Sequence, residues 1–166
     1  MIGRAVIWWR EERRARIRRG PVGGIPRRGP APGLLEATAP FVRAVYAKEM
    51  LEALRDTPAE RRIAILGDML ELGPEGPRFH REAGERAAEL GFSPVVGVGE
   101  LSRELVAGAG PGAVWLPDAA AAADWAASEI RGGDVVLVKG SRSVKLDRVV
   151  RRLLGRLPGD NGEGAH

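Results

Sequence analysis

A short polar turn near the end of the chain carries the residue types best suited to binding an anion. Lys139, Gly140, Ser141 and Arg142 directly follow the apolar run at residues 135–138 and precede an amphipathic segment. Lysine and arginine supply cationic donors, glycine lets the backbone approach closely, and serine adds a hydroxyl beside a helix start. Such a turn suits a carboxylate or a phosphate. A simple strand-to-helix turn with a solvated lysine and arginine explains these residues equally well.

Two other residues are weaker candidates. Asp68 follows the apolar run at residues 63–66, where it could bind an ammonium group or orient a cation. At this spacing, a loop aspartate that caps its turn is the favoured interpretation. His80 begins a helical segment, a place where we expect a surface or capping residue, and no serine or cysteine stands at the spacing of a nucleophile triad. We therefore predict no catalytic residue in this chain.

Nucleotide and metal motifs are missing from the sequence. Gly97-Val98-Gly99 is followed by Ser102 where the last glycine of G-x-G-x-x-G would stand, and no G-x-x-x-x-G-K-[ST] occurs. We therefore expect no loop that cradles ATP phosphates. The chain has two histidines and no cysteine, which argues against a thiolate or histidine metal site.

The elements that position these residues alternate along the chain. Apolar runs predict strands at residues 63–66, 95–98, 114–116 and 135–138. Helical patterns cover residues 41–54, 79–90, 100–107, 118–130 and 144–157, with Asp118 as a predicted N-cap and Gly91 as a stop. This alternation predicts an α/β, Rossmann-like parallel sheet with helices on both faces. Ligands of such sheets bind beyond the carboxyl ends of the strands, which is where Asp68 and the Lys139–Arg142 turn would lie.

The first part of the chain differs in composition from the rest. Residues 1–40 are rich in arginine, proline and glycine and carry a net charge of +6 within a total of +4. We predict a disordered basic tail over residues 1–40, in which a short helix over roughly residues 9–19 is compatible with the pattern but has no obvious core to join. A folded domain over 41–157 and a disordered end over 158–166 would follow. No apolar run reaches the roughly 20 residues that span a bilayer, so we expect no membrane contact and a cytoplasmic location.

Several motifs occur together in a familiar order. They are I-L-G-D-M-L-E-L-G at residues 65–73, H-R-E-A-G at 80–84, V-G at 98–99 and G-D-V-V-L-V-K-G-S-R-S at 133–143. Over about residues 51–155 the chain resembles the C-terminal domain of the Mur ligases, in particular the type that adds D-alanyl-D-alanine to UDP-MurNAc-tripeptide in peptidoglycan synthesis.

The resemblance implies a function in a larger enzyme. Such ligases combine a domain for the UDP-sugar-peptide, a central P-loop ATPase domain and this Rossmann-like domain. With ATP and magnesium they phosphorylate the precursor carboxylate, which the amine of D-alanyl-D-alanine then attacks. The resemblance implies that Asp68, His80, Lys139, Ser141 and Arg142 face the interdomain cleft. Lys139 or Arg142 would contact a carboxylate or phosphate, while this chain alone would bind neither ATP nor magnesium.

The chain also departs from the family pattern. The family's D-[DS]-x-Y-N-A-N-P element has no match at residues 43–50, and the ATPase and UDP-sugar-peptide domains are not in this sequence. We therefore interpret the chain as a fragment of a truncated or frameshifted ligase gene, inactive alone, that could complement a separate ATPase domain. Loss of the domain's first strand would leave an exposed sheet edge.

A second interpretation belongs to another functional class. The chain could be a stand-alone small α/β binding module whose arginine-rich tail contacts nucleic acid or another acidic partner. Only Trp8 and Trp9 accompany the arginines, and glycine and proline dominate afterwards. We therefore do not expect nucleic acid to be the partner.

Overall fold

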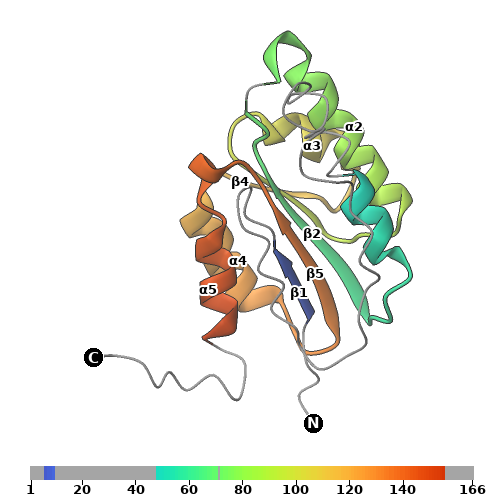
Figure 1. Ribbon diagram of the computed structural model, residues 1–166, viewed down its shortest axis with the longest axis vertical. Helices are drawn as coiled ribbons and strands as arrows, with labels where there is room; N and C mark the ends of the chain where they lie inside the picture. Colours follow the sequence, from blue (N-terminus) through green and yellow to red (C-terminus); the bar gives the residue numbers. More distant parts are fainter. Residues whose placement is uncertain (1–5, 10–47, 71, 156–166) are drawn as a thin grey trace, which may run out of the picture.

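A parallel sheet forms the centre of the domain. The computed structural model describes residues 48–70 and 72–155, together with the backbone of residues 6–9. Within these residues, five parallel strands lie in the order β1-β5-β2-β3-β4 (Figure 1). The strands are β1 (Val6–Trp9), β2 (Arg61–Gly67), β3 (Val95–Val98), β4 (Val114–Leu116) and β5 (Asp134–Lys139). The predicted α/β parallel sheet is confirmed, and all four predicted strands are present.

The central strands β2 and β5 are apolar because both of their faces are covered. Residues 63–66 and 135–138 are all buried, which is the pattern expected of a parallel sheet between two helical layers. The register pairs Ile65 with Val138 and Leu66 with Lys139. The two strands therefore end side by side, and the loops that follow them meet at one edge of the sheet.

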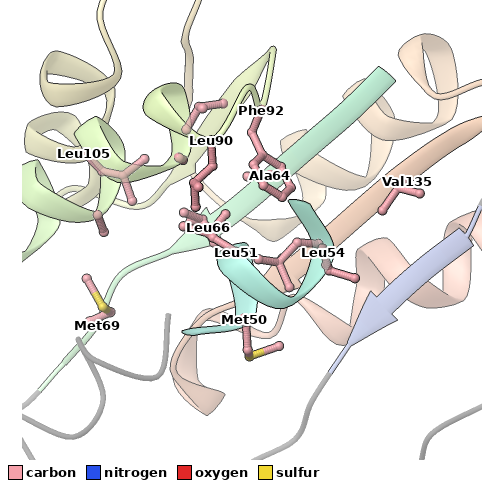
Figure 2. Close-up of a cluster of buried hydrophobic side chains, with 14 of the residues drawn as sticks. Met50, Leu51, Leu54, Ala64, Leu66, Met69, Leu90, Phe92, Leu105 and Val135 are labelled. Carbon is pink, nitrogen blue, oxygen red and sulfur yellow. The ribbon is translucent and has the colours of Figure 1, made fainter. Parts of the chain in front are cut away.

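Helices cover both faces of the sheet, as predicted. One layer holds a helix over residues 48–55, α2 (Gly76–Glu89) and α3 (Ser102–Ala109), and the other holds α4 (Ala119–Glu129) and α5 (Asp147–Leu154) (Figure 1). Figure 2 shows the first core, where Leu51 and Leu54 of the 48–55 helix pack with Leu66, Phe92 and Leu105. This helix therefore closes one face of the sheet.

The second core relies on small side chains. Ala122 and Ala126 of α4 are fully buried and pack with Ile63 and Val136 of the sheet and with Val149 of α5. Alanine lets a helix approach a sheet of β-branched residues closely, which explains the alanine-rich composition of this segment. Asp118 begins α4 as the predicted N-cap, because its carboxylate accepts hydrogen bonds from the amides of Ala120 (2.8 Å) and Ala121 (2.9 Å).

The last helix begins later than predicted. The last helix was expected from residue 144, but a 3-10 turn, η2 (Arg142–Val144), comes first and α5 starts at Asp147. Between them Lys145 adopts a left-handed backbone conformation (φ 57°), which interrupts a continuous helix. Of the helix predicted over 41–54, residues 41–47 lie outside the described part of the chain, and so do residues 156–166.

The structure corrects the prediction of a wholly disordered tail over residues 1–40. Val6–Trp9 forms strand β1, which pairs in parallel with residues 135–138 of β5. The expected exposed edge is therefore covered at β5, because an apolar run of β-forming residues satisfies backbone groups that would otherwise face solvent. The rest of residues 1–40, including the helix considered at 9–19, lies outside the described residues.

Candidate functional site

The turn after β5 is fastened to the loop after β2 at the carboxyl edge of the sheet. The amide of Ser141 donates to the carbonyl of Asp68 (3.1 Å), and the Ser141 hydroxyl accepts a hydrogen bond from the amide of Leu70 (2.9 Å). Ser141 is buried, so these bonds are shielded from water. Ser141 therefore joins the two loops and holds the turn with its neighbouring cations against the loop after β2.

The glycine in this turn is required by the same close approach. A Cβ on Gly140 would lie 2.9 Å from Cδ1 of Leu146 and 3.1 Å from Cα of Gly67. Contacts this short would push the turn away from β2. The Lys-Gly-Ser-Arg sequence and the Gly-Asp-Met sequence therefore depend on each other structurally.

Asp68 caps a helix that is distant in the sequence. Its Oδ1 accepts hydrogen bonds from the amide (2.8 Å) and hydroxyl (2.8 Å) of Ser102, and its Oδ2 accepts one from the amide of Leu101 (3.3 Å). The side chain is only 9% exposed. Capping was the favoured interpretation of Asp68, but the helix that it caps is α3 and not its own turn. Both carboxylate oxygens are already used within the protein.

Gly99 makes room for this carboxylate. Its backbone has φ +106°, and an added Cβ would lie 2.5 Å from Oδ2 of Asp68. Only glycine satisfies both conditions. The Gly97-Val98-Gly99 sequence therefore serves the packing of the β3–α3 turn, where the indole Nε1 of Trp115 also donates to the Gly99 carbonyl (2.8 Å).

His80 is not at the surface as the sequence suggested. It is fully buried (0% exposed), its Nδ1 lies 2.7 Å from the carbonyl oxygen of Gly76, and its Nε2 accepts the amide of Met69 (2.9 Å). These partners imply the tautomer with the proton on Nδ1. The side chain supports the Asp68–Leu70 loop through its hydrogen bond with the Met69 amide. A sequence signal for this burial existed, because His80 shares a helix face with the buried Ala83 and Ala87.

The cations of the turn lie at the carboxyl end of β5 and in the 3-10 turn that follows it. Lys139 is half-buried at the end of β5 and Arg142 is exposed in η2, and each makes a contact within the protein. Lys145, exposed just after η2, was not singled out from the sequence. The structure thus joins the Asp68 loop and Ser141 by hydrogen bonds, and His80 supports the same loop through the Met69 amide. Lys139 and Arg142 lie on either side of Gly140 and Ser141 in the sequence.

A partly buried ion pair secures the opposite edge of the central strands. Arg61 binds both carboxylate oxygens of Asp134 (2.9 and 2.7 Å), and Asp134 is only 1% exposed. The hydrogen bonds that Arg61 donates to Asp134 raise the pKa of Arg61. On α2, the hydrogen bond from Lys48 lowers the pKa of Glu82, which ties the 48–55 helix to α2. These pairs are structural and lie away from the candidate site.

Comparison with known proteins identifies the domain. The model of the Mur ligase glutamate ligase domain matches residues 45–142. The chain belongs to the Mur ligase family. The match includes the Asp68 loop, His80 and the turn at Lys139–Arg142, so the interlocked edge lies within the family domain.

The similar curated proteins carry one name. The UDP-N-acetylmuramoyl-tripeptide–D-alanyl-D-alanine ligase of Synechocystis sp. is 33% identical over 111 residues, which cover 65% of this chain and 24% of that ligase. The ligase of the same name from Mycobacterium leprae is 37% identical over 105 residues, covering 58% of this chain and 20% of the relative. This Mur ligase chain therefore spans about a quarter of the length of the curated relatives that it matches.

Solved structures agree with this assignment. MurF ligase from Thermotoga maritima in complex with ADP has a TM-score of 0.56 and 28% identity, over 66% of this chain and 25% of that one. A MurF structure from Acinetobacter baumannii, at 20% identity and a TM-score of 0.59, covers 68% of this chain and 26% of its own and supports the fold. The Mur ligase C-terminal domain expected from the motifs is confirmed.

The described residues do not fit a magnesium site. No cluster of three or more histidine, aspartate or glutamate side chains that could hold a metal ion occurs among them. The carboxylate oxygens of Asp68 accept hydrogen bonds from the start of α3. Within the same residues, no helix is long and apolar enough to cross a membrane.

Proposed function

We propose that this Mur ligase domain contacts substrate in the ATP-dependent addition of D-alanyl-D-alanine to UDP-MurNAc-tripeptide. The observation that carries the proposal is the Ser141 link between the two loops, which presents Lys139 and Arg142 at the edge where parallel sheets bind ligands. The name shared by the curated relatives supports the choice of reaction.

The residues of the edge divide into two roles in this proposal. Lys139 and Arg142 contact an anion, either the carboxylate of the dipeptide or a phosphate, because both supply charged donors at the carboxyl edge of the sheet. Asp68, Ser141 and His80 are positioning residues, since their polar side-chain atoms are engaged by α3, by the Leu70 amide and by the Gly76–Met69 region. The chemistry of bond formation is left to groups outside this chain.

The partner of the domain is a separate ATPase part of a ligase. The Thermotoga maritima MurF structure is a complex with ADP, which supports a nucleotide as a ligand of the complete ligase. We propose that ATP and its magnesium ion bind mainly to that other part, and that the encounter takes place in the cytoplasm. The interpretation of the chain as a stand-alone module with a nucleic-acid-binding tail receives no support from the comparisons.

The proposal is tested by mixing the chain with the remaining domains of the Synechocystis ligase and measuring ATP-dependent ligation. In the Lys139→Ala/Arg142→Ala variant, loss of charged hydrogen bonds predicts an increase of about ten-fold or more in the KM for D-alanyl-D-alanine or ATP. A variant with the same charge change on α2, Arg78→Ala/Arg81→Ala, is the matched control and should leave both KM values unchanged. Unchanged KM values in the first variant would contradict the assignment.

A further inference from the structure

A charged hollow lies on the outer face of the domain, between α4 and α5. Its volume is about 840 Å³ and it is open to solvent. Four cationic and two acidic side chains line it, together with Ala120 and Ala123 of α4. The acids are Asp124 and Asp147, so the lining has an excess of positive charge.

The cations of α5 point along one side of the helix. Arg148 and Arg152 of α5 are four residues apart, which places them on one side of the helix, and Lys145 lies in the turn just before α5. Arg148 and Arg152 are separated by one helical turn, or about 6 Å along the axis. Among the described residues, none of these three side chains makes a hydrogen bond or ion pair, whereas Arg151 binds Asp147.

This absence of partners is unusual within the described part of the domain. Every arginine from residue 55 to residue 103 binds an acid or a carbonyl oxygen, as in the pairs Arg81–Glu104 and Arg86–Glu52. Lys139 and Arg142 also have contacts. The side chain of Arg131 is unpaired too, but it does not line the hollow. Unneutralised positive charge is therefore concentrated beside α5, where it attracts an anion.

The lining indicates the kind of anion. Ala120, Ala123 and Asp124 form the α4 side of the hollow and no aromatic side chain lines it, so it offers no surface on which a base could stack. One arginine guanidinium can bind two phosphate oxygens at once. Several neighbouring cations therefore suit a ligand that carries several neighbouring negative charges. We propose that the α4–α5 hollow binds an oligophosphate chain, recognising the phosphates and not an attached base or sugar. This site adjoins the Lys139–Arg142 turn at Lys145, but its arginines belong to α5, and the proposal does not depend on the proposed ligase function.

The test uses the full chain and inorganic tripolyphosphate in calorimetry at low salt. We expect saturable binding to one site, weakened about ten-fold or more in the Arg148→Ala/Arg152→Ala variant and weakened by added salt. The matched control is Arg81→Ala/Arg86→Ala, which removes the same charge from paired arginines on α2 and should change the affinity less than about two-fold. Circular dichroism confirms that each variant is folded.

Three further arms identify the source and the place of binding. ATP should bind about as tightly as tripolyphosphate, because only the phosphates are recognised, and an ATP affinity that is much greater would overturn phosphate-only recognition. A hexaglutamate peptide that binds more tightly than tripolyphosphate would overturn the proposal in favour of an acidic protein partner. Loss of binding in Lys139→Ala/Arg142→Ala, with retention in the α5 variant, would place the ligand at the sheet edge instead. Equal loss in the α2 control, or no saturable binding at all, would also overturn the proposal.

Discussion

Replacing Asp68 separates a structural role from a ligand-binding role at the candidate site. In the structure, the carboxylate holds the amides of Leu101 and Ser102 at the start of α3. In Asp68→Ala, the loss of a helix cap costs about 0.5–2 kcal/mol, and a buried amide left without a partner costs about 1–3 kcal/mol. The Ser102 hydroxyl is less affected because it also donates to the Val98 carbonyl (3.1 Å). We therefore expect a total loss of about 2–4 kcal/mol from the free energy of unfolding.

The conservative variant refines this expectation. Asp68→Asn keeps one acceptor oxygen for Ser102 but replaces a charged acceptor with a neutral one, which predicts a loss of about 1–2 kcal/mol. Urea unfolding followed by circular dichroism measures both losses. The control is Asp124→Ala on α4, an exposed aspartate with no side-chain partner among the described residues, for which we expect a change within about 0.5 kcal/mol.

A small effect of Asp68→Ala on stability would exclude the capping role. If Asp68→Ala changed the free energy of unfolding by less than about 0.5 kcal/mol, as surface substitutions do, the carboxylate would not be a significant cap for α3. Asp68 would then be available to a ligand, and its assignment as a positioning residue would be wrong.

Three other substitutions test the frame around the site. Gly99→Ala should lower the free energy of unfolding by about 2–4 kcal/mol, because alanine is strained at φ +106° and its Cβ meets a carboxylate; an unchanged midpoint in urea would contradict this. Arg61→Ala should cost about 3 kcal/mol because it leaves Asp134 buried without its cation, and a loss below 1 kcal/mol in thermal unfolding would show that the pair is unimportant. The lowered pKa of Glu82 means that its pairing with Lys48 stabilises the fold above the ordinary glutamate range and that this contribution is lost as the pH falls below about 4. Glu82→Gln should therefore remove roughly 0.2–1 kcal/mol at pH 7 and less at pH 3, and an equal loss at both values would refute the linkage.

The sequence predicted the core of this fold well because its local and global signals agree. Residues 63–66 and 135–138 are apolar throughout, as is typical of strands that are covered on both faces. These residues lie in β2 and β5. Asp118 and Gly91 marked helix ends by mechanisms that act over a few residues. The start of α5 was misplaced because the left-handed conformation of Lys145 has no signal in its residue type.

Features that depend on distant contacts could not be predicted in the same way. The pairing of Val6–Trp9 with β5 joins segments far apart in the chain, and nothing local to residues 6–9 indicates a partner strand. The motifs located the edge with Asp68, Ser141 and the neighbouring cations, but which side chains face a ligand depended on hydrogen bonds between loops. The helix face that His80 shares with Ala83 and Ala87 could have indicated its burial, but its acceptor role for the Met69 amide exists only after the loop folds against α2.

The most direct test of the ligase assignment is a chimera. The matching C-terminal region of the Synechocystis ligase is replaced by residues 45–155 of this chain, and the ATP-dependent joining of D-alanyl-D-alanine to UDP-MurNAc-tripeptide is measured. The account predicts that a folded chimera forms the product and that Lys139→Ala/Arg142→Ala raises its KM for the dipeptide or ATP about ten-fold or more. A folded chimera that forms no product would contradict the ligase assignment. Unchanged KM values in the Lys139→Ala/Arg142→Ala chimera would contradict the role of the two cations.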